Sequence, residues 1–137
     1  MAQILDGKKL AEKILAGVKG ETIKLEKPLR LAIVIVGEDP VVRKFVEQKK
    51  KKADEAGINI RIYHFPGAIT TNELRKRLAE IVHEENNHGV IVQLPLPSHI
   101  NSQYILNAVT PEKDVDMLSA KSIGNFVVGK SAIMSPV

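Results

Sequence analysis

The sequence contains no cysteine and no tryptophan. Without cysteine the chain can form no disulfide, no thiolate zinc site and no cysteine nucleophile. Its longest uninterrupted apolar run covers residues 31–36, whereas a membrane-spanning helix needs roughly 20 apolar residues. The opening segment MAQILDGKKL has no apolar stretch of the kind found in secretory signals. These absences favour a cytoplasmic protein with no membrane partner and no metal site.

Aromatic residues are scarce. They are Phe45, Tyr63, Phe65, Tyr104 and Phe126. Such scattered rings do not predict a platform for stacking nucleic-acid bases. The net charge of +4 and the pI near 9.3 are compatible with binding of phosphates. Much of the excess lies in one run of lysines, however, and it suits a small anionic ligand equally well. We therefore expect no nucleic-acid partner.

Four segments of the chain have the pattern of strands. Residues 29–37 and 89–94 are continuous apolar runs, which are typical of strands covered on both faces. Residues 58–65 alternate isoleucines with polar residues, which predicts a strand with one more polar face. Residues 122–133 contain glycines and branched aliphatic residues, and we interpret them as a hairpin or a short strand.

Helical patterns lie between these strands. They cover residues 40–57, 70–82 and 102–109, which start at the N-cap residues Asp39, Thr70 and Asn101, and a further helical pattern over residues 6–27 precedes the first strand. Strands that alternate with helices pair in parallel through right-handed crossovers. The sequence therefore predicts one α/β domain over residues 1–137, a three-layer α/β/α sandwich with a mainly parallel sheet of about four strands.

Four consecutive lysines follow one another in the helix predicted for residues 40–57. The apolar face of that helix consists of Val42, Phe45, Val46, Ala53 and Ala56. At about 100° per residue, Lys49 falls within this face, whereas Lys50 and Lys51 lie roughly 100° and 200° away from Lys49. Lys52 lies just past the margin. The spacing therefore predicts that Lys49 alone points towards the sheet.

An inward lysine has two interpretations. Its aliphatic stem can cover the sheet edge while the ammonium reaches water, or its amine can serve a site. Lys49 lies about 14 Å along its helix, so the sequence alone does not bring it to any strand end.

Two further segments carry polar groups of interest. Gln93 lies near the carboxyl end of an apolar strand, where ligands bind in open α/β sheets; alternatively, its amide caps a neighbouring loop. The loop KDVD presents Asp114 and Asp116 at i and i+2. These carboxylates are either solvated charges or ligand-binding groups.

Together these segments resemble the N-terminal half of the bifunctional methylenetetrahydrofolate dehydrogenase/methenyltetrahydrofolate cyclohydrolase family (the FolD type). The similar segments are ILDGKKLAEKI, LAIVIVGEDP, FVEQKKKKADEAG, GVIVQLPLP and PEKDVD. VQLPLP followed by PEKDVD is the most specific feature. The resemblance implies a single folate-binding catalytic domain over residues 1–137. It also implies that the family's NADP-binding Rossmann domain lies outside this sequence, which contains no G-x-G-x-x-G segment.

The resemblance implies a role for each site residue. In the family motif Y-V-x-x-K, an aromatic residue stacks on the folate and a lysine is catalytic; here these are Phe45 and Lys49. Gln93 resembles the catalytic partner that orients the lysine, and Pro95 of the same motif is implied to contact the substrate. Asp116 resembles the catalytic-site aspartate that binds the pterin edge. A lysine can accept a proton during hydrolysis, and a carboxylate can accept two hydrogen bonds from a pterin.

The sequence also departs from the family pattern. Phe45 replaces a tyrosine, Met117 replaces a glycine that would leave more room for the pterin, SIGNF is a loose form of N-x-G-x-L, and MSPV resembles the linker C-T-P. Two alternatives therefore stay open: a diverged folate-binding module without catalysis, and a basic protein that binds phosphates or nucleic acid.

For the complete enzyme, the resemblance implies NADP, a homodimer and 10-formyltetrahydrofolate as product, within one-carbon metabolism and purine biosynthesis. For this chain alone it implies a monomer that binds folate and no cofactor.

Overall fold

A computed structural model describes residues 5–131 and residue 133. The elements follow the order α1 (Gly7–Thr22), β1 (Arg30–Val36), α2 (Pro40–Glu55), β2 (Asn59–Phe65), α3 (Thr71–His83), β3 (Gly89–Val92), α4 (Ser102–Leu106) and α5 (Ala120–Val127). Helices and strands alternate as far as β3, as the sequence predicted. No helix in the described part of the chain is both long and apolar enough to cross a membrane.

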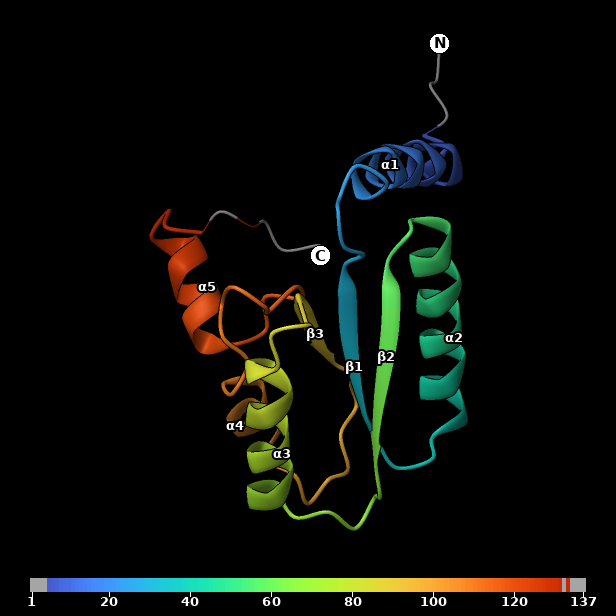
Figure 1. The fold of residues 1–137 in the computed structure, drawn as a ribbon. Coiled ribbons are helices and arrows are strands. Elements are labelled where there is room, and N and C mark those ends of the chain that lie inside the picture. The colour runs from blue at the N-terminus through green and yellow to red at the C-terminus, as the bar shows by residue number, and fades with distance from the viewer. Residues whose placement is uncertain (1–4, 132, 134–137) are drawn as a thin grey trace.

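The sheet has the strand order β2-β1-β3, and all pairs are parallel. In the central strand β1, Val34 pairs with Tyr63 of β2 on one side and with Val92 of β3 on the other. On the outer edge of β3, Asp114 forms a single parallel bridge with Val90, where a fourth strand would lie. Helix α2 covers one face of the sheet, and α3 and α4 lie on the other (Figure 1). The predicted three-layer α/β/α class is confirmed.

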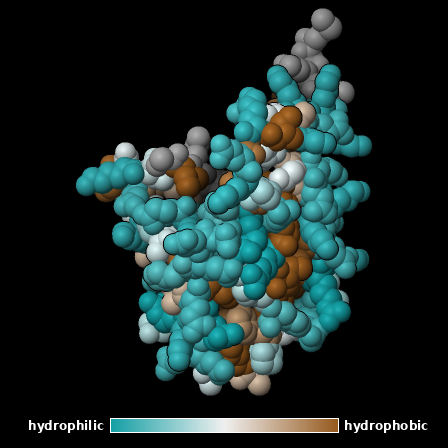
Figure 2. All heavy atoms as spheres, viewed as in Figure 1, coloured by the Kyte–Doolittle hydropathy of each residue, from teal (hydrophilic) through white to brown (hydrophobic). Residues whose placement is uncertain are grey.

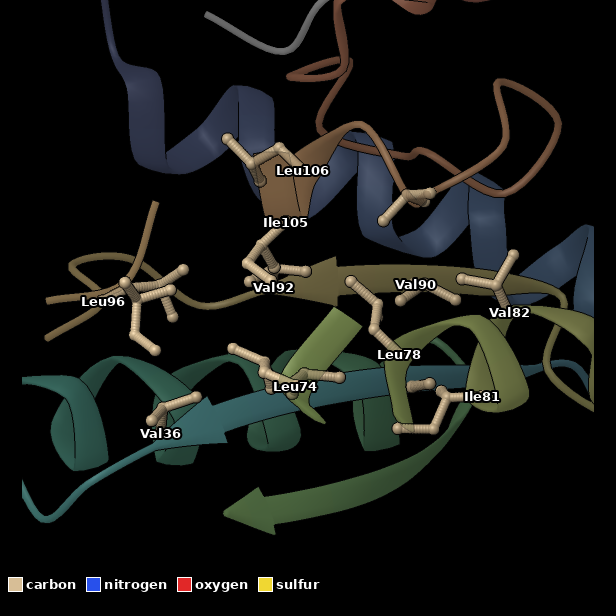
Figure 3. Packing of buried hydrophobic residues seen from close by; sticks show 14 of the residues in the cluster. Val36, Leu74, Leu78, Ile81, Val82, Val90, Val92, Leu96, Ile105 and Leu106 are labelled. Atoms are coloured by element: carbon tan, nitrogen blue, oxygen red, sulfur yellow. The ribbon is translucent and has the colours of Figure 1, made fainter. Parts of the chain in front are cut away.

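Side chains of β1 alternate between two apolar cores, because successive residues of a strand point to opposite faces. Ala32, Val34 and Val36 pack with residues of β3, α3 and α4. Figure 3 shows this core from close by. Ile33 and Ile35 pack on the other face, beneath α2. β1 is therefore buried on both faces from Ala32 to Val36, which explains the continuous apolar run in the sequence.

Local signals set the bounds of α2. The Oδ1 atom of Asp39 accepts hydrogen bonds from the backbone N–H groups of Val41 (2.7 Å) and Val42 (3.3 Å), and Pro40 occupies the first turn. After the C-cap, Gly57 has a φ of 73°, in the left-handed region that favours glycine. Both ends of this helix were readable from the sequence.

The prediction of a hairpin or short strand for residues 122–133 is wrong, because Ala120–Val127 form the helix α5. Ser119 is its N-cap, and the Ser119 Oγ atom accepts a hydrogen bond from the backbone N–H of Ser122 at 3.2 Å. The serine cap and the spacing of Ile123, Phe126 and Val127 at three and four residues favour a helix. The segment MSPV lies outside the described residues.

Helix α1 ends at Thr22, earlier than the predicted residue 27. It lies near the amino ends of the strands (Figure 1). Its apolar residues Leu10 and Ile14 are exposed. Figure 2 shows hydrophobic atoms on α1 and in the region of the edge strand β2. The contact with the rest of the domain is made at the end of the helix, where Thr22 Oγ1 donates a buried hydrogen bond to the carbonyl oxygen of Ala56 at 2.6 Å.

Candidate functional site

Lys49 differs from the three lysines that follow it. It is half-buried, whereas Lys50, Lys51 and Lys52 are exposed. The Nζ atom of Lys49 donates a hydrogen bond to Oε1 of Gln93 at 2.8 Å. The orientation predicted from the helical spacing is therefore observed, and the ammonium has a polar partner within the domain.

The lengths of the strands explain how Lys49 reaches Gln93. Val92, the last residue of β3, pairs with Val34, and the backbone N–H of Gln93 donates to the Val34 carbonyl oxygen at 2.9 Å. β1 continues for two residues to Val36, so Val92 lies about 7 Å and Gln93 about 3 Å before the end of β1. α2 starts beyond that end and runs back along the sheet. Lys49, in the middle of α2, therefore lies beside the strands near Gln93 rather than beyond their ends.

The side-chain amide of Gln93 uses both of its ends. Oε1 accepts from Lys49, and Nε2 donates to the carbonyl oxygen of Leu94 at 3.0 Å. The amide thus binds the lysine and also braces its own loop, as the second interpretation of Gln93 expected. The Leu94–Pro95 peptide bond is cis, and Pro95 is exposed at the same strand end.

Asp116 is half-buried in the loop that follows the bridge to β3. Its burial raises the pKa of the Asp116 carboxyl above its ordinary value, the Lys49 ammonium acts in the opposite direction, and Asp114 raises it further. Lys49 and Asp116 are thus close enough to interact electrostatically. No hydrogen bond from the described residues contributes to this shift, which leaves the carboxyl oxygens available to a ligand.

Phe45 lies one helical turn before Lys49, and residues four apart share a helix face. Its ring is 52% exposed, although a benzyl side chain of this kind is commonly buried. Leu94, beside Gln93, is also exposed. The site therefore combines an open aromatic face with a lysine, an amide and a carboxyl group, a set that suits a flat ligand with a polar edge.

Met117 follows Asp116 and is buried with a φ of 55°. This left-handed conformation costs a side-chain-bearing residue energy that glycine does not pay. The departure from the family glycine thus falls at a position where the backbone favours glycine.

Sequence reasoning missed Lys113 of the KDVD loop, and its expectation that Asp114 is a solvated or ligand-binding carboxylate is wrong. The Nζ atom of Lys113 donates to the carbonyl oxygens of Val82 (2.6 Å) and Glu84 (3.0 Å) at the end of α3. Asp114 is buried and bonded to the start of α5. Ser119 before α5 was the available signal, because a serine there is a typical N-cap. No group of three or more metal-ligating His, Cys, Asp or Glu side chains occurs within the described residues.

Comparison with known proteins gives consistent matches. The family model for "Tetrahydrofolate dehydrogenase/cyclohydrolase, catalytic domain" matches residues 5–116. The chain is 40% identical over 131 residues to the bifunctional protein FolD of Moorella thermoacetica, which covers 93% of this chain and 47% of that protein. It is 41% identical over 137 residues to FolD of Anaplasma phagocytophilum, covering 97% of this chain and 45% of the relative.

Solved structures agree. The crystal structure of FolD, a methylenetetrahydrofolate dehydrogenase/cyclohydrolase, from Campylobacter jejuni superposes with a TM-score of 0.93 at 34% identity, over 97% of this chain and 49% of that one. FolD of Trypanosoma brucei, solved with NADP cofactor and inhibitor, superposes with a TM-score of 0.88 at 28% identity, over 98% and 48%. The chain thus spans about half the length of the relatives it matches.

Proposed function

Because this chain belongs to the tetrahydrofolate dehydrogenase/cyclohydrolase family, we propose that it is the folate-binding catalytic part of a bifunctional methylenetetrahydrofolate dehydrogenase/methenyltetrahydrofolate cyclohydrolase. One observation carries the proposal: the hydrogen bond of 2.8 Å between Lys49 Nζ and Gln93 Oε1, at the carboxyl end of β3. Ligands bind at this edge in open α/β sheets. An inward lysine held by a neutral amide is suited to proton transfer.

The lysine serves the hydrolytic step. Water adds to the methenyl carbon of methenyltetrahydrofolate, which lies between two nitrogens and carries the positive charge. The Lys49 amine accepts a proton from that water as the carbon–oxygen bond forms. Cleavage of one carbon–nitrogen bond then leaves the formyl group on the other nitrogen, and the released nitrogen takes up a proton. The net result is 10-formyltetrahydrofolate and one proton.

The other site residues bind and orient the folate. Phe45 stacks on a ring of the ligand, Asp116 accepts hydrogen bonds from the N–H and NH2 groups of the pterin edge, and Gln93 holds the Lys49 amine in place. Pro95 forms part of the wall beside Gln93. The half-buried position of Asp116 makes these hydrogen bonds stronger than they would be in water.

The oxidation of methylenetetrahydrofolate belongs to the complete enzyme, for which NADP is the proposed cofactor. The solved relative from Trypanosoma brucei contains NADP, and no G-x-G-x-x-G segment occurs in this sequence. We therefore assign cofactor binding to the part of the relatives that this chain does not match. For the complete enzyme we propose a homodimer in cytoplasmic one-carbon metabolism, and for this chain alone a monomer without bound cofactor.

Substitution of single lysines tests the proposal. Lys49→Met keeps the aliphatic stem and removes the amine, and it should lower methenyltetrahydrofolate hydrolysis above the spontaneous rate by about 10²- to 10⁴-fold, the usual contribution of general acid–base catalysis. Lys50→Met and Lys51→Met are matched controls, because both side chains are exposed. Both should stay within a few-fold of the parent. Hydrolysis is followed by absorbance in this chain and in a version joined to the second half of a relative.

Other outcomes point elsewhere. Equal losses from all three substitutions would indicate a diffuse positive surface that binds anions, and binding would then weaken steeply between roughly 50 and 200 mM salt. Undiminished hydrolysis in Lys49→Met would rule out the amine as proton acceptor and leave a folate-binding module of another kind.

A further inference from the structure

The carboxyl group of Asp114 is buried and fully engaged. The residue is 4% exposed, which is rare for an aspartate unless it is paired or hydrogen-bonded. Oδ1 accepts from the backbone N–H of Leu118 at 3.3 Å, and Oδ2 accepts from the Ser119 backbone N–H at 2.9 Å and from Ser122 Oγ at 2.7 Å. All three donors lie at the start of α5, so the carboxylate ties this helix to the loop.

The backbone of the same loop is attached to β3. Asp114 bridges Val90, and the Val90 backbone N–H donates to the Lys113 carbonyl oxygen at 2.8 Å. The Lys113 side chain is itself bonded to the last carbonyls of α3. Asp114 therefore lies at the junction of a strand, a helix end and a helix start.

The next residue of the loop is also fixed. Val115 packs against the α2-side core, and it lies so close to Gly89 that a Cβ atom on that glycine would meet Val115 Cγ1 at 2.8 Å. Of the four residues of KDVD, three are thus anchored within the fold. The fourth, Asp116, is half-buried, and Lys49 is near enough to lower the pKa of its carboxyl.

We propose that Asp114 is a positioning residue, which holds Asp116 beside Lys49 by tying the start of α5 to the edge of β3. Asp116 belongs to the candidate folate site. The positioning role of Asp114 does not depend on the proposed function, but its expected effect on folate binding does. Capping of α5 does not depend on Asp114, because Ser119 Oγ already accepts a hydrogen bond from the Ser122 backbone N–H. The positioning role of Asp114 can therefore be tested separately from the capping of the helix.

Two charged groups act on Asp116, and they allow a direct test. Lys49, from α2, lowers the pKa of Asp116, and Asp114, from the same loop, raises it. In the parent chain Lys49→Met should therefore raise the pKa of Asp116. If Asp114 holds Asp116 beside Lys49, this coupling should be lost in an Asp114→Asn background.

The experiment is a double-mutant comparison. Carbon-detected NMR titration of the Asp116 carboxyl is carried out with and without Lys49→Met in the parent, in Asp114→Asn and in Asp54→Asn. Asp54 is an exposed aspartate of α2, and its substitution controls for loss of a negative charge, so the coupling should persist there. The same upward shift in the Asp114→Asn background as in the parent would overturn the proposal.

A second background variant and a binding measurement complete the test. If Asp114→Asn does not fold, Ser122→Ala provides the background, because it removes one donor to the carboxylate and keeps the charge; an undiminished coupling there would overturn the proposal. Calorimetry with 5-formyltetrahydrofolate should show affinity weakened roughly tenfold or more in Asp114→Asn. A parent chain that binds no folate would contradict the proposed function, whereas the titration would still decide the positioning role.

Discussion

At the scale of single residues, direction distinguishes side chains of the same type. Lys49 donates to Gln93, while Lys50 and Lys51 are exposed and the exposed Lys52 pairs with Glu55 of its own helix. Asp114 and Asp116 are separated by one residue, yet the first is bonded within the fold and the second faces the site. Composition and charge do not distinguish the lysines from one another or the two aspartates from one another. The direction of each side chain depends on its position along the helix or loop and on the contacts that hold that segment in place.

Phe45 provides a prediction on ligand binding. Its ring is exposed on the same helix face as Lys49. Removal of the ring should therefore weaken ligand binding more than it lowers the free energy of unfolding. Phe45→Ala should weaken folate binding by roughly 1–3 kcal/mol, whereas Phe45→Tyr should change it little, because the stacking face is kept. Calorimetry measures both. An unchanged affinity in Phe45→Ala would place the ligand away from this ring.

Asp116 provides a prediction on pH and stability. Burial raises its pKa above the ordinary value of 3.8, so the folded state holds the proton more tightly than the unfolded state. The stabilising effect of the protonated group is present below the ordinary pKa and is lost as the pH rises through the raised pKa. Asn cannot ionise. Asp116→Asn should therefore gain stability relative to the parent at about pH 7 and less at about pH 3.

Urea denaturation at both pH values checks this expectation. A stability difference that does not vary with pH would contradict a raised pKa at Asp116. The same substitution should weaken folate binding, because the amide offers only one acceptor oxygen to the pterin edge. A gain in stability combined with a loss of binding is the pattern expected of a residue kept for function.

At the scale of elements, α1 and α5 show the limits of periodicity. The spacing of Leu10, Ile14 and Val18 predicted a helix, and that helix exists, but these residues line an open groove of about 640 Å³ along α1. In α5, Ile123 and Phe126 are also half-exposed. A hydrophobic period thus identifies a helix without stating what its apolar face contacts.

Thr22 provides a prediction for α1. It is the buried residue of this helix, and its hydroxyl donates to the Ala56 carbonyl oxygen at 2.6 Å. Thr22→Val keeps the shape and removes the donor, so the free energy of unfolding should fall by about 1–3 kcal/mol. Thr22→Ser, which keeps the hydroxyl, should lose less. Equal losses in urea denaturation would assign the contribution to the methyl group instead.

At the scale of the whole molecule, the chain corresponds to one half of its relatives. Its sheet of three parallel strands is built around β1 and carries the candidate site at one edge. The residues proposed for the hydrolysis all lie in this half, whereas the proposed oxidation also needs a nicotinamide cofactor. The two activities of the complete enzyme should therefore separate between the halves.

The chain by itself should show no dehydrogenase activity, because its sequence contains no G-x-G-x-x-G segment for the phosphates of a dinucleotide. The test incubates the chain with methylenetetrahydrofolate and either NADP or NAD and follows the absorbance of the reduced cofactor. Joining the second half of a relative should restore the signal. Turnover by the chain alone would place a cofactor site within these residues.

The sequence by itself determined the α/β alternation, both ends of α2 and the inward direction of Lys49. These features depend on short-range rules: the period of a helix or strand, the capping of an N-terminus and the left-handed glycine after a helix. The resemblance in VQLPLP and PEKDVD added the candidate residues Gln93 and Asp116. Their roles are proposals that the experiments above address.

Only the tertiary structure decided which of these residues meet. Lys49 and Gln93 are 44 positions apart, and their contact depends on β3 ending two residues before β1 in the parallel register. The helical form of α5 and the burial of Asp114 likewise depend on each other, because the helix start supplies the donors that a buried carboxylate requires. Strand register and the pairing of buried polar groups arise from contacts between distant segments, which no local period encodes.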